Sequence, residues 1–140
     1  MTRFVGAAAL ILVACVSCST GSTDPLRGLS FVASTTLSPT KALLTTASVT
    51  NENSDSVTVH YGTCPLDVFL HTGTYDGPVV YESAAGRGCT LIALQKTLAP
   101  GETLQFTESD APPVAAGTYY VTVRIEVNGF GSVSAGTVTL

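Results

Sequence analysis

Apolar and polar residues alternate along most of the chain after residue 28, in short runs separated by turn-forming residues. The clearest run covers residues 119–127, where every second residue is apolar and those between are mostly polar. A period of two is typical of strands with one buried and one wet face, and no useful stretch has the 3.6-residue period of a helix. The pattern predicts strands at residues 29–35, 43–50, 57–61, 66–71, 79–81, 91–94, 104–106, 119–127 and 132–140.

Short strands at this spacing predict an all-β fold, a single antiparallel immunoglobulin-like β-sandwich of about eight strands. Asn128-Gly129 predicts a hairpin between the last two strands. The spacing of Gly117, Tyr119 and Val121 is that of a tyrosine corner, in which the Tyr119 hydroxyl bonds backbone upstream. Asp67 and His71 are expected on outward strand faces. The predicted core is Phe31, Val49, Val57, Val59, Val68, Leu70, Leu104, Phe106, Tyr119, Val121, Val123 and Ile125.

The first residues carry a different apolar pattern. A short start containing Arg3 precedes an unbroken apolar run, residues 4–14, which matches a secretory signal peptide and is too short to span a membrane. Leu12-Val13-Ala14-Cys15 resembles the bacterial lipobox, which implies cleavage before Cys15 and lipidation of its thiol. We therefore expect a lipoprotein signal peptide at residues 1–14, a lipidated flexible tether at 15–27 and the sandwich domain at 28–140.

Two other interpretations of this segment stay open. It could be an ordinary secretory signal with incidental cysteines, because small residues also suit ordinary cleavage. Alternatively, Cys18 could carry the lipid, although Cys15-Val16-Ser17 before it is a poorer match to the lipobox. On the lipobox interpretation the protein is exported and lipid-anchored to a membrane of the bacterial cell envelope, with its domain facing the periplasm or the exterior.

Charge and cysteines narrow the function classes. Charged residues make up 11% of the chain, and its formal net charge is −4. The few basic residues are scattered, whereas a nucleic-acid surface needs a concentrated basic patch. Cys64 and Cys89 are expected to form a disulfide, because disulfides persist in exported proteins. Zinc is the competing interpretation, but His60 and His71 do not complete a zinc-ligand spacing, so no metal or cofactor is expected.

A family resemblance comes from three motifs in order along the chain. These are Val49-Thr50-Asn51 followed by a turn and a Val-Thr-Val strand, then residues 97–104 (TLAPGETL), then residues 116–121 (AGTYYV). Together they resemble the BsuPI-type proteinase-inhibitor domain, which implies an immunoglobulin-like β-sandwich over most of residues 28–140 and proteinase inhibition as a function. The chain differs from the namesake of that family in its export signal and in its Cys64/Cys89 pair.

No arrangement of residues points to catalysis. The sequence has no G-x-S-x-G elbow, no Ser or Cys locally paired with His, and no paired carboxylates. Residues 51–55 offer several oxygens, but they lack the glycine and terminal glutamate of an EF-hand loop, so a plain turn is expected. The chain is therefore predicted not to be an enzyme.

Three non-catalytic functions remain open. The first is a module that binds another exported or envelope protein, the second is proteinase inhibition, and the third is a structural subunit of an envelope complex. For inhibition, Arg87 lies between two glycines next to Cys89, and a lone arginine in a loop held by a disulfide could enter the pocket of a trypsin-like proteinase. The alternative is that the glycines shape a turn and Arg87 points into water.

Overall fold

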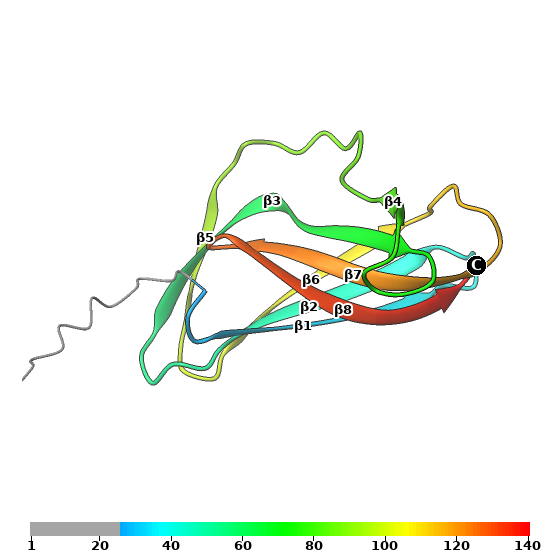
Figure 1. Ribbon diagram of the computed structural model, residues 1–140. Coiled ribbons are helices and arrows are strands. Elements are labelled where there is room, and N and C mark those ends of the chain that lie inside the picture. The colour runs from blue at the N-terminus through cyan, green and yellow to red at the C-terminus, as the bar shows by residue number, and fades with distance from the viewer. Residues whose placement is uncertain (1–25) are drawn as a thin grey trace, which may run out of the picture.

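The computed structural model describes residues 26–140, so the predicted signal peptide, the lipid on Cys15 and nearly all of the predicted tether lie outside the described residues. The described part consists of eight antiparallel strands in two sheets, which confirms the predicted β-sandwich (Figure 1). Over residues 26–140, no helix has the length and apolar character that a membrane crossing requires. The strands are β1 (Leu29–Leu37), β2 (Leu43–Asn51), β3 (Val57–His71), β4 (Val79–Glu82), β5 (Leu94–Leu98), β6 (Thr103–Asp110), β7 (Thr118–Val127) and β8 (Phe130–Thr139).

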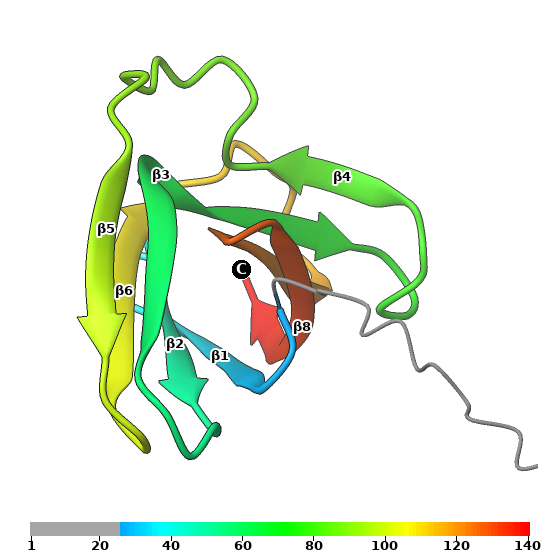
Figure 2. The same cartoon turned by 90° about the vertical axis from the view of Figure 1, so that its left-hand side faces the viewer.

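One sheet has the order β1-β2-β6, and the other has the order β4-β3-β7-β8 with β5 also paired to β3. The second sheet is divided because β3 is long and bent: its first half pairs with β5 and its second half with β4 and β7 (Figure 2). The sequence pattern predicted two separate strands, residues 57–61 and 66–71. That prediction was wrong, because the chain stays extended through the intervening residues instead of turning.

The core lies between the two sheets and consists mainly of Val, Leu and Ile side chains from alternate strand positions. Most predicted core residues are buried. Phe31, Val57, Leu104 and Phe106 are only partly buried and pack against the edge of the core. The pattern missed several fully buried side chains, because they stand at strand ends or beyond the bounds expected for a strand. These include Leu43, Leu66 and Leu98.

Two of the three motifs that carry the family resemblance meet at one turn. Asn51 is fully buried at the end of β2, and its side-chain amide donates hydrogen bonds to the carbonyls of Asp55 and Leu98. The backbone of Asn51 also bonds to Gly101 and Glu102 of the β5–β6 turn. The first two motifs therefore join the turn after β2 to the β5–β6 turn, which is a structural role and fits the expectation of a plain turn.

The third motif is the tyrosine corner, as predicted. The Tyr119 hydroxyl donates a hydrogen bond of 2.7 Å to the carbonyl of Ala115, which fixes the connection between β6 and β7. The β7–β8 hairpin at Asn128-Gly129 is also confirmed, and both residues adopt positive φ as a tight turn of this kind requires.

Candidate functional site

The most irregular part of the fold is a bulge in β3. Tyr61 pairs with Val127 and Leu66 pairs with Ile125, so five steps along β3 match only two along β7. The extra residues at 62–65 include Pro65, which has no N–H to donate to a sheet ladder. Bulges of this kind are common beside functional sites because they redirect side chains. Here the bulge presents Cys64 to the long β4–β5 connection.

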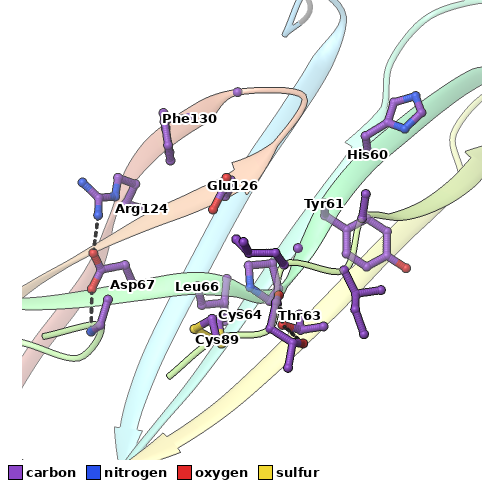
Figure 3. Close-up of a pocket in the computed structure, with 18 of the residues that line it drawn as sticks. His60, Tyr61, Thr63, Cys64, Leu66, Asp67, Cys89, Arg124, Glu126 and Phe130 are labelled. Carbon is purple, nitrogen blue, oxygen red and sulfur yellow. Dashed lines mark hydrogen bonds and ion pairs between the residues drawn. A yellow bond between two sulfur atoms is a disulfide. The ribbon is translucent and has the colours of Figure 1, made fainter. Parts of the chain in front are cut away.

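That connection, residues 83–93, is held to the bulge by a disulfide and by two hydrogen bonds. The structure joins Cys64 to Cys89, with 5.9 Å between their Cα atoms (Figure 3). One residue further on each side, the Thr63 hydroxyl donates to the Thr90 carbonyl and accepts from the Thr90 hydroxyl, both at 3.0 Å. The end of the connection is therefore attached firmly to the most irregular point of β3.

The start of the connection is held by buried polar groups. Asp67 accepts hydrogen bonds from the backbone N–H of Ala84 and from the Ser83 hydroxyl, and it forms an ion pair of 2.6 Å with Arg124. Arg124 also lies over the ring of Phe130 (Figure 3). Asp67 lies on an outward strand face, as expected, but the connection folds over this face and buries its carboxylate. Strand alternation alone cannot show which outward positions a loop will cover.

Arg87 is bound to its own domain. Its guanidinium donates hydrogen bonds to the Ser83 carbonyl and to Glu108 on β6, and Asp110 lies 3.9 Å away. The hydrogen bond to Glu108 raises the pKa of Arg87. The Tyr81 hydroxyl donates to Asp110, and burial together with this hydrogen bond raises the pKa of the tyrosine. Residues 83–86 form a turn with Gly86 at positive φ, as the second interpretation of this segment expected. The Arg87 side chain does not point freely into water, because it is paired with Glu108.

The tip of the connection is exposed and apolar. Leu91 is fully exposed (106%) and Ile92 is 55% exposed, and neither belongs to a strand. The predicted strand at residues 91–94 was wrong because the ladder with β3 ends at the pair of Tyr61 and Leu94, where the bulge removes the partner edge. Leu94 and Phe130 are also exposed large apolar residues of this part of the molecule.

A pocket of about 530 Å³ lies beside this tip, between the β3 bulge, the end of the connection and the β7–β8 hairpin (Figure 3). Its lining is mostly apolar, and its acidic members are Asp67, which is paired to Arg124, and Glu126. Among residues 26–140, no group of three or more His, Cys, Asp or Glu side chains is placed to bind a metal ion. Its apolar lining and the exposed Leu91 and Ile92 beside it are features of a contact surface.

His71 was expected on an outward face, but it is buried and both of its ring nitrogens are bonded. Nδ1 is 2.9 Å from the Gly77 carbonyl and must carry the proton, because a carbonyl only accepts. Nε2 is 2.7 Å from the Thr122 hydroxyl. A base that activates a nucleophile is oriented by a third group, typically a carboxylate, and here that place is taken by a neutral carbonyl. The arrangement attaches the β3–β4 turn to the sheet.

The comparison with known families identifies the domain. The sequence model of the family BsuPI, intracellular proteinase inhibitor, matches residues 31–130, which is most of the chain. The chain belongs to the BsuPI family. This confirms the resemblance carried by the three motifs. The BsuPI family is one of inhibitors, which is compatible with a protein that is not an enzyme.

Two solved structures are similar over a large part of this BsuPI chain. One is a crystal structure of a protein assigned as ApaA from Bordetella pertussis, with 23% identity over 80% of this chain and 89% of that chain and a TM-score of 0.38. The other is an X-ray structure of a structural genomics target, with 13% identity over 80% and 83% of the two chains and a TM-score of 0.33. No curated protein matches the chain.

Proposed function

We propose that this BsuPI protein is a non-catalytic protein-binding module of the proteinase-inhibitor type, exported and held at a cell-envelope membrane by a lipid on Cys15. The observation that carries the binding role is the β4–β5 connection, an exposed apolar loop fixed at both ends by Asp67 and by the Cys64–Cys89 disulfide. A loop ordered before binding loses little conformational entropy on binding, which favours tight association. The family match makes proteinases the first partner class to test.

The inhibitory function is tested with the full-length chain, purified in mild detergent, against serine, cysteine, aspartic and metallo-proteinases. We expect stoichiometric inhibition of at least one enzyme at concentrations of about 1 µM, which corresponds to about −8 kcal/mol of binding free energy. If no proteinase of any class loses activity, the inhibitory function is wrong. Persistence of one stable envelope partner after mild crosslinking would then support the structural-subunit alternative.

The membrane location is tested separately, since the family is one of intracellular inhibitors whereas residues 1–14 are predicted to be a signal peptide. Cys15→Ser should abolish fatty-acid labelling and release the protein from the membrane fraction, because two or three acyl chains are needed for stable anchoring. The matched control is Cys18→Ser, which should leave both unchanged. If fatty-acid labelling survives Cys15→Ser and disappears with Cys18→Ser, Cys18 carries the lipid and the assignment to Cys15 is wrong.

A further inference from the structure

The tip of the β4–β5 connection, residues 90–93, is a short extended segment between two fixed points. Before it, Cys89 is covalently bound to Cys64 in the β3 bulge. After it, Leu94 begins β5 through its pairing with Tyr61, on the other side of the same bulge. Both fixed points are therefore on one strand, and the segment between them runs in extended form into β5 (Figure 1).

The backbone of this tip is available for pairing. Within the described part of the chain, no backbone hydrogen bond involves the N–H or C=O of Leu91, Ile92 or Ala93. The Thr90 carbonyl is held by Thr63, which fixes the direction in which the next residues leave the domain. An exposed segment with free backbone groups can add to the strand-like edge of a partner's cleft, and side chains then supply specificity.

The side chains of the tip are suited to an apolar pocket. Leu91 is fully exposed and Ile92 is about half exposed, whereas Arg87, the cation of the same connection, is bound to Glu108. A fully exposed leucine loses no internal contact when it enters a partner's pocket. The burial of a leucine side chain contributes about 1.5–3 kcal/mol, which is about 10- to 150-fold in affinity.

Taken together, and resting on the proposed function, we infer that residues 89–94 are the proteinase-binding loop of this BsuPI domain. Leu91 fills the specificity pocket of a serine proteinase whose pocket is an apolar slot, as in chymotrypsin-type specificity. Such an enzyme binds the loop as it binds a substrate, with Leu91 on the acyl side of the scissile bond and Ile92 on the amine side.

The two fixed points, Cys89 and Leu94, explain why a loop that binds as a substrate would inhibit the proteinase. If the catalytic serine hydroxyl attacks the Leu91 carbonyl carbon, the bond to the Ile92 nitrogen breaks and the hydroxyl proton passes to that nitrogen. The acyl fragment stays attached through Cys89, and the amine fragment stays attached through the β5 ladder that begins at Leu94. The amine is thus held beside the acyl carbon and can reverse the reaction before water enters, so the enzyme remains occupied.

The test measures inhibition constants of the full-length protein and its variants against serine proteinases with apolar, small and acidic pockets. The native protein should inhibit enzymes with apolar pockets, and Leu91→Asp should weaken that inhibition by about 100-fold or more, because a carboxylate would lose its water in an apolar slot. Leu91→Lys should transfer inhibition to enzymes with an acidic pocket. The matched control is Val32→Asp, at an exposed apolar residue of β1 in the other sheet, which should leave every inhibition constant unchanged.

The outcomes separate the inference from the proposed function. If the native protein inhibits a proteinase and Leu91→Asp inhibits it equally well, the loop assignment is overturned and the inhibitory function stands. If the native protein inhibits only metallo- or aspartic proteinases, the loop assignment is likewise overturned and the inhibitory function stands. Long incubation with the target should also produce a trace of chain cut between Leu91 and Ile92, with the mass of one water added. A dominant cut elsewhere in residues 83–94 would overturn the choice of Leu91.

Discussion

The disulfide gives the most quantitative prediction. Cys64 and Cys89 are 25 residues apart in sequence, and their bond closes a loop that contains β4 and most of the β4–β5 connection. Replacing both with serine frees this loop in the unfolded chain. The chain-entropy treatment for a loop of this length gives a loss of about 3.5 kcal/mol in the free energy of unfolding. For a domain of this size, that corresponds to a fall of about 10–15 °C in Tm.

The assay is urea and thermal unfolding of the full-length native protein and of the Cys64→Ser/Cys89→Ser variant, followed by circular dichroism. Native protein treated with a reductant should unfold like the double variant, and Cys18→Ser should unfold like the native protein. The reasoning is refuted if the double variant is less than about 1 kcal/mol below the native protein, because the Thr63–Thr90 contacts and the Asp67 anchor would then hold the loop without the covalent bond.

Three further variants test other contacts. Tyr119→Phe should cost about 1 kcal/mol by removing the bond to the Ala115 carbonyl, and an unchanged urea midpoint would argue against a functional tyrosine corner. Asn51→Ala should cost about 2–4 kcal/mol because it deprives two backbone carbonyls of their donor, a loss that the same unfolding assay measures. The Tyr81 hydroxyl donates to Asp110, and the pKa of Tyr81 is raised in the folded protein. The stability that the protonated hydroxyl contributes is therefore complete below about pH 10 and is lost as the pH rises further. Tyr81→Phe should therefore flatten the alkaline fall in stability, measured by urea unfolding between about pH 8 and 11, and an identical fall in both proteins would contradict this.

The sequence predicted the sandwich well because strand periodicity is a local property. The alternation of residues 119–127, the Asn128-Gly129 turn and the corner tyrosine each depend on neighbours within a few positions, and all three were found as predicted. The family resemblance was correct for a similar reason, because its motifs encode turns such as the one that Asn51 organises.

The candidate site was less predictable, because it depends on contacts between segments far apart in sequence. Nothing near Arg87 in the sequence indicates that Glu108, on a strand of the other sheet, will bind it. The burial of Asp67 likewise requires a loop that folds back over an outward strand face. The sequence pattern predicts a strand at Leu91 because its apolar neighbours satisfy the strand period, and only the bulge in β3 shows that they have no partner there.

Contact between Leu91 and a proteinase is tested most directly by photo-crosslinking from position 91, in intact cells that naturally make the protein. A photoreactive amino acid placed at position 91 should form a crosslink to an exported serine proteinase, identified by mass spectrometry, and an active-site inhibitor of that enzyme should abolish the crosslink. The same amino acid at position 32, on the other sheet, should not capture it. Identical products from both positions, or a position-91 partner that is not a proteinase, would contradict the account.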